Sequence, residues 1–119
     1  MGLDIYFTRK SLETLTTFRK VNFLVRFFES KGLDVKHQRP LTIKKVWCEE
    51  LKDRCEQVLQ DHSRAKELLP NRSGFFFGST EYNDYYFQDV KEVKDFLESL
   101  IPSFDTLSDT EHIDFEIWY

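Results

Sequence analysis

The chain has 119 residues, 40% hydrophobic and 16% aromatic, with a formal net charge of −4; this predicts one folded domain, residues 1–119, and excludes a disordered chain. No apolar run approaches the ~20 residues that a membrane-spanning helix needs. The first ten residues lack the pattern of a secretory signal, so we expect a cytoplasmic protein that does not cross a membrane.

The first two predicted elements are a strand and a helix. Near the start, Leu3, Ile5 and Phe7 alternate with Asp4 and Tyr6, which is typical of a half-buried strand. A helix is then predicted from about Leu15 to Lys31, with Gly32 as its stop signal. Its apolar stripe consists of Phe18, Val21, Leu24, Val25 and Phe28.

A second apolar stripe predicts a helix from Thr42, its N-cap, to about His62. Residues 63–69 are compatible with an extension that ends at Pro70. Cys48 and Cys55 lie on one face of this helix, about two turns or roughly 10 Å apart. Their separation is too large for a disulfide, so we expect two reduced, structural thiols.

The block GFFFGSTEYNDYY, residues 74–86, predicts two elements. The apolar run from Gly74 to Gly78 favours a central strand that is covered on both faces. Asn83 is predicted to be the N-cap of a third helix, which ends at Pro102. Residues 112–119 again alternate and predict a last strand.

These elements predict an α+β fold in a single compact domain. Its small sheet, of about three strands, includes both chain termini and is packed with about three helices. Charge is distributed unevenly along the chain: residues 1–45 carry ten Lys and Arg against four Asp and Glu, whereas residues 80–119 carry two against eleven. Two interpretations remain open: the two ends meet in the fold and neutralise each other, or they form a bipolar surface that steers a charged partner.

Three segments of the chain resemble a family of small phage and prophage-type bacterial proteins with no established activity. They are MGLDIY at the start, FRKVNFLVRFF at 18–28, and LLPNRSGFFFGSTEYNDYYFQDV at 68–90. Members of the family begin MGLDMY, carry a YWRKAN-like helix followed by His-x-Trp-Phe, and contain an LLPxxxGFFFGSxxYDExY block. The resemblance implies kinship and an origin in a mobile element, but no chemistry.

The matching positions and the departures from the family's pattern both bear on a site. This chain has Val25 where the family has His, and Asn83 where the family has the Asp of YDE. A catalytic role for that His is therefore not available here. The matching polar positions are Arg19, Lys20 and Asn22 in the first predicted helix, and Gly74, Gly78, Ser79, Tyr82, Asp84 or Asn83, and Tyr85 in the second block.

The polar segment after Gly78 has two interpretations. The simpler one is a capped helix start with a solvated face. The functional one is a contact surface, because tyrosines among polar neighbours are frequent in recognition surfaces. The basic residues of the first predicted helix also have two interpretations, as structural partners of the acids or as a basic stripe that binds phosphate. The candidate binding residues are Arg19, Lys20, Asn22, Ser79, Glu81, Tyr82, Asp84, Tyr85 and Tyr86.

The sequence favours a non-catalytic binding protein that contacts a host protein or a small ligand through the turn after Gly78. The alternative is a small metal- or nucleotide-dependent enzyme that uses Glu81, Asp84 and Asp89 with Arg19. No catalytic residue, metal ligand or cofactor is predicted, and the three histidines lack zinc-site spacing. The acidic balance disfavours nucleic acid as a partner. The pattern is compatible with a monomer and with a homodimer.

Overall fold

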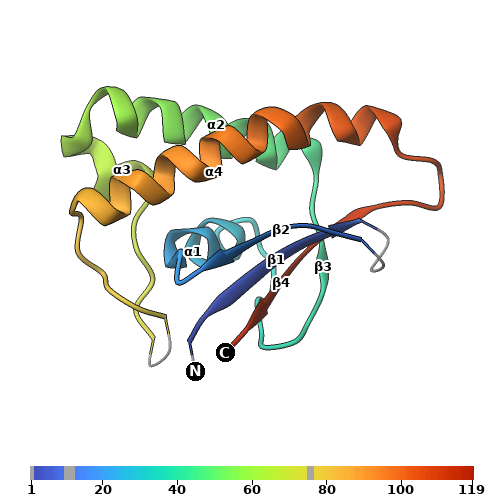
Figure 1. Cartoon of the computed structure of the whole chain (residues 1–119), viewed down its shortest axis with the longest axis horizontal. Coiled ribbons are helices and arrows are strands. Elements are labelled where there is room, and N and C mark those ends of the chain that lie inside the picture. The colour runs from blue at the N-terminus through green and yellow to red at the C-terminus, as the bar shows by residue number, and fades with distance from the viewer. Residues whose placement is uncertain (1, 10–12, 75–76) are drawn as a thin grey trace.

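The computed structural model describes residues 2–9, 13–74 and 77–119 and confirms the α+β class. Both ends of the described chain lie in one antiparallel sheet, next to each other (Figure 1). In chain order the elements are β1 (Asp4–Arg9), β2 (Glu13–Arg19), α1 (Asn22–Glu29), β3 (Leu41–Thr42), α2 (Lys45–Gln60), η1 (His62–Arg64), α3 (Ala65–Leu68), α4 (Asp84–Ser103), η2 (Phe104–Thr106) and β4 (Ile113–Trp118).

The sheet has the strand order β2-β1-β4-β3, so the two strands nearest the chain ends form its centre. In the β1–β4 pair, Ile5 lies opposite Ile117 and Phe7 opposite Phe115. All four side chains are buried. Because side chains alternate between the two faces of a strand, this register puts the apolar residues of both strands on one face, which is the floor of the core.

Helices cover this apolar face. Phe28 of α1 packs against Phe115 with ring centroids 4.5 Å apart, and Phe96 of α4 lies 5.1 Å from Phe7. Helix α2 runs alongside α4, and together they form the long upper edge of the molecule in Figure 1. Helix α1 is enclosed on several sides, because Phe23 also contacts Tyr86 of α4 and Phe27 lies beneath Arg54 of α2.

The prediction of one helix from Leu15 to Lys31 is wrong in its first part. Residues 13–19 form β2, and α1 begins only at Asn22. The segment holds three threonines, whose β-branched side chains favour a strand. Phe18 fitted the helical stripe because it is also buried, but it reaches the core from the sheet, with its ring 6.2 Å from that of Phe7.

The prediction of a central strand at Gly74–Gly78 is also wrong for the residues that can be assessed. Gly74, Phe77 and Gly78 belong to none of the four strands. The Phe77 amide donates to the Gly74 carbonyl at 3.1 Å instead of to a neighbouring strand, and Gly78 has φ +87°. Phe77 is buried, as expected of a core residue. Phe75 and Phe76 lie outside the described residues. Strands β2 and β3, which occupy the two outer positions of the sheet, were not predicted.

The second predicted helix is present with different ends. It begins at Lys45 instead of Thr42, because Thr42 belongs to β3 and its hydroxyl donates to the buried carboxylate of Asp114 at 3.0 Å. Residues 63–69 do not extend it, since η1 and α3 follow as separate short turns. Cys48 and Cys55 are free and buried, and burial raises the pKa of both thiols to about 12. They are therefore structural thiols, as predicted.

The third predicted helix is α4, and its N-cap is confirmed. The Asn83 side chain accepts a hydrogen bond from the Tyr86 amide at 3.1 Å. The helix does not end at Pro102 but includes it and ends at Ser103. None of the helices in the described part of the chain combines the length and the hydropathy that a membrane crossing requires.

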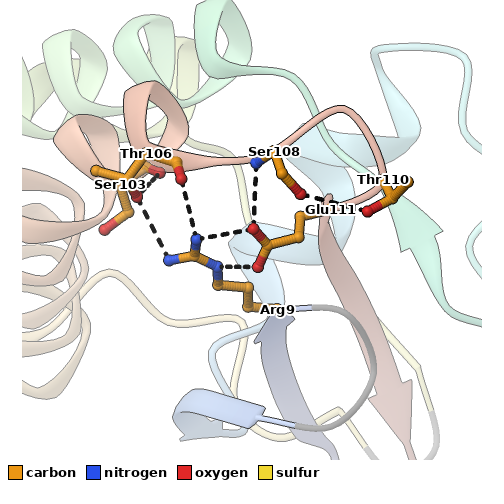
Figure 2. Close-up of polar contacts among 6 residues, drawn as sticks. All are labelled: Arg9, Ser103, Thr106, Ser108, Thr110 and Glu111. Carbon is orange, nitrogen blue, oxygen red and sulfur yellow. Dashed lines mark hydrogen bonds and ion pairs between the residues drawn. The ribbon is translucent and has the colours of Figure 1, made fainter.

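The basic and acidic ends of the chain meet in the fold. Lys45 pairs with Asp105 at 3.1 Å, and Arg9 at the end of β1 pairs with Glu111 before β4. Figure 2 shows that the Arg9 guanidinium faces both Glu111 oxygens, at 3.0 and 3.3 Å, and also donates to the Thr106 carbonyl. This network fastens the segment after α4 to the central strand.

We predict that the Arg9–Glu111 pair makes stability depend on acid pH. Hydrogen bonds from Arg9 and Ser108 lower the pKa of Glu111 from 4.5 to about 2. A pKa that is depressed in the folded state gives stability that is present above the unfolded value and is lost as the pH falls through the folded value. The free energies of unfolding of the wild type and of Glu111→Gln, measured in urea, are therefore expected to differ at pH 6. The two values should converge as the pH falls from about 4.5 to 2. A difference that stays constant over this range would contradict the assignment.

Candidate functional site

A hollow of about 230 Å³ opens where β2, α1 and the start of α4 meet. The segment between α3 and α4 forms its far wall. Three stretches of the chain that are distant in sequence, residues 19–23, 71 and 79–89, therefore contribute to one concavity. The residues that line it are Arg19, Lys20, Val21, Asn22, Phe23, Asn71, Ser79, Glu81, Asn83, Tyr85, Tyr86 and Asp89.

Asn22 holds the hollow together. Its side chain is at the start of α1, and the residue is 2% exposed. The amide nitrogen donates to the carbonyls of Phe77 and Ser79 at 3.0 and 2.9 Å, and the amide oxygen accepts from the Arg72 amide at 2.9 Å. Described residues 71–74 and 77–83 lie in no helix or strand, so these bonds replace partners that a ladder would supply.

Lys20 is placed at the hollow by a strained backbone and two glycines. It has φ +60°, in the left-handed region that side-chain-bearing residues rarely adopt, and its amide donates to the Leu3 carbonyl at 2.7 Å. A Cβ atom on Gly78 would lie 3.1 Å from the Lys20 Cβ, and one on Gly2 would lie 2.9 Å from the Lys20 Cε. The lysine stem therefore lies in a slot that only residues without a side chain leave open.

The opposite wall is acidic and aromatic. Glu81 precedes α4, and Asp89 projects from its second turn. Burial raises the pKa of Asp89 to about 6, and the nearby Glu92 contributes in the same direction. Tyr86 is buried and its hydroxyl donates to the Leu69 carbonyl at 2.7 Å, whereas Tyr85 is 83% exposed on the rim. The hollow is thus lined by both cations and carboxylates.

The structure brings together seven of the nine predicted binding residues: Arg19, Lys20, Asn22, Ser79, Glu81, Tyr85 and Tyr86. Arg19 was expected in the first predicted helix, together with Asn22. It is instead the last residue of β2, and the sharp turn at Lys20 brings both residues to the hollow.

The other two predicted residues do not line the hollow. Tyr82 supports its wall, because its hydroxyl accepts from the Asn71 amide at 3.0 Å. Asp84 is exposed in the first turn of α4. Asn71 was missed, although it lies in the block that carries the family resemblance. Its side chain donates to the Glu81 carbonyl at 3.4 Å.

The alternative metal site has a weaker geometric basis. It was predicted from Glu81, Asp84 and Asp89, of which only Glu81 and Asp89 line the hollow. Within residues 2–9, 13–74 and 77–119, no three His, Cys, Asp or Glu side chains are grouped closely enough to hold a metal ion.

Comparison of the chain with models of known protein families, with curated proteins and with solved structures gives no match. The function proposed below therefore depends on the geometry and the charges of the hollow.

We predict that Gly78→Ala destabilises the protein more than Gly32→Ala does. Both glycines have φ +87°, so either substitution should cost about 1–2 kcal/mol of backbone strain. Only the new methyl group at position 78 meets Lys20; nothing lies within 4 Å of the corresponding position at Gly32. Crowding of this kind adds about 1–3 kcal/mol. If urea unfolding shows that both variants lose the same free energy of unfolding, the slot around Lys20 is not tightly packed.

Proposed function

We propose that this chain is a non-catalytic binding protein of phage or mobile-element kinship that works in the cytoplasm and captures a host protein. One observation supports the binding role above all. Arg19 and Lys20 line the same hollow as Glu81 and Asp89, and the highly exposed ring of Tyr85 stands at its rim.

Within the described part of the chain, the cations and the carboxylates of the hollow do not neutralise one another by pairing. No ion pair among the described residues joins Arg19 or Lys20 to Glu81 or Asp89. Lys20 keeps a strained conformation there, and strain of this kind concentrates at functional sites. Separate charges of both signs favour a partner that itself carries an acidic and a basic group in close succession.

Tyr85 fits a protein partner better than a solvated helix surface. An exposed tyrosine buries a large apolar area on contact and loses little side-chain freedom, and tyrosines are enriched among residues that dominate binding energy. With Tyr85 at the rim and charges inside, the hollow would take a charged side-chain pair while the ring packs against the partner's surface. A small zwitterionic ligand would use the same charges but would make less use of the ring.

The proposal predicts that capture of the partner depends on the hollow and not on the neighbouring acidic surface. Tagged protein is expressed in its bacterial host, and the co-purified proteins are quantified. The double variant Lys20→Gln/Tyr85→Ala is expected to lose the enriched partner at least about tenfold, because it removes one charge-assisted contact and one aromatic anchor. Asp84→Ala is the matched control, since Asp84 adjoins Tyr85 in sequence but does not line the hollow.

Two outcomes would contradict the proposal. In the first, the double variant keeps the partner at the level of the wild type while its melting temperature is unchanged. In the second, Mg²⁺ or a nucleotide raises the melting temperature of the wild type and Asp89→Asn abolishes the shift. The second result would favour the alternative enzyme or nucleotide-binding role of Glu81 and Asp89 with Arg19.

A further inference from the structure

A second hollow of about 220 Å³ lies on the other side of α1, between α1, α2 and the segment that follows α3. Phe23 of α1 lines both hollows, and Arg26 reaches from the second one to the carbonyl of Asn71, a residue of the first, at 3.2 Å. The two hollows therefore lie on either side of the segment 69–71. They differ in chemistry.

The inner surface of the second hollow is apolar. Phe23, Phe27 and Leu69 are 2%, 4% and 1% exposed, so they form part of the core and cannot easily move away. Pro70 and Leu68 complete this surface. A concave apolar surface with a few polar groups at its edge is the usual form of a small-ligand site.

Besides Ser30, whose hydroxyl donates to the Phe27 carbonyl, the polar groups at its edge are two guanidinium groups. Arg54 of α2 lies over the Phe27 ring, 5.4 Å from its centroid, and donates to the Leu68 carbonyl at 3.1 Å. Arg26 donates to the Asn71 carbonyl. Among the described residues, Arg26 takes part in no ion pair. A guanidinium has five N–H donors, so both groups are held in place while donors remain for a ligand.

The surrounding charge is positive. Lys31 lies 5.2 Å from the centroid of the same Phe27 ring. Against Arg26, Arg54 and Lys31 stands one nearby carboxylate, Glu50, which pairs with Lys31 and, at 3.6 Å, with Arg54. Glu50 thus pairs with two of the three cations, and Arg26 has no ion pair among the described residues. An anion that enters would bind Arg26 without displacing a carboxylate from it, and it would share Arg54 with Glu50.

We propose that this second hollow binds a carboxylate attached to an apolar group, with the apolar group on Phe23, Phe27 and Leu69 and the carboxylate on Arg26 and Arg54. The planar guanidinium matches a carboxylate through two parallel hydrogen bonds, which a lysine cannot form. The hollow should prefer this ligand to an inorganic anion, because an inorganic anion would leave the apolar surface uncovered. The site is independent of the hollow around Lys20, whose mixed charges suit a different ligand.

The chemistry has two sources, a free small acid or the C-terminal residue of a peptide, and two probes separate them. The first probe is 3-phenylpropanoate and the second is acetyl-Gly-Gly-Phe with a free carboxylate; the matching primary amide of each is its control. Binding is followed by amide chemical shifts in the full chain. At least one acid is expected to shift the amides around Phe27 and Leu68 and to bind at least about tenfold more tightly than its amide, because the amide loses the charge-assisted bonds.

Variants test whether Arg26 carries this preference. Arg26→Gln is expected to remove at least about tenfold of the affinity, and Arg26→Lys to restore part of it through charge alone. Arg39→Gln is the matched control, because Arg39 is an exposed arginine that lies outside this hollow. Binding of 3-phenylpropanoate alone identifies a free acid, and binding of the peptide identifies a C-terminus. The proposal is overturned if neither acid binds at millimolar concentration, if acid and amide bind equally, or if a folded Arg26→Gln binds as the wild type does.

Discussion

The buried amide of Asn22 is the interaction on which the rest of the site depends. It holds two carbonyls and one backbone amide of a segment that has no ladder of its own. A buried polar group without a partner costs about 1–3 kcal/mol. Because the Asn22 side chain pairs with three backbone groups, it stabilises the observed path of this segment over other conformations. That path brings Ser79 and Glu81 to Arg19 and Lys20 and supports the cap of α4.

The second constraint is the turn between β2 and α1. Two residues connect the strand to the helix, and one of them, Lys20, has φ +60°. Glycine would fit this position with less strain, yet a lysine occupies it and two glycines make room for its stem. A basic group is thereby fixed at the hollow at some cost in stability, which is the usual relation between strain and function.

Local patterns were sufficient for part of the fold. The alternation at both ends predicted β1 and β4, and the Asn83 cap predicted the start of α4. Local patterns were insufficient where tertiary contacts decide the secondary structure of a segment. Phe18 is buried from a strand but matches a helical stripe, and the apolar run before Gly78 contributes Phe77 to the core from a turn. The threonines before Phe18 were a short-range signal for a strand that was not used, and the glycines that bound the run were interpreted as the ends of a strand.

Seven of the nine candidate residues line one hollow, although the elements of some of them were predicted wrongly. Arg19 was assigned to the wrong element and still lines the hollow, because the residues that converge there were chosen by their chemistry and by a family resemblance. Asn71 was not found, since a buried asparagine in a loop leaves no periodic signal. The second hollow was not found either, because Arg26 and Arg54 meet only when α1 packs beside α2.

Amide hydrogen exchange at Arg72 tests the central claim most directly, because this amide donates to the Asn22 side chain. In the near-isosteric variant Asn22→Leu, exchange at Arg72 is expected to accelerate at least about tenfold, as the loss of about 1.4 kcal/mol of local protection implies. The amides of β1 that pair with β4 should remain slow. Unchanged exchange at Arg72 would contradict the account, and so would an equal acceleration of Arg72 and the central strands.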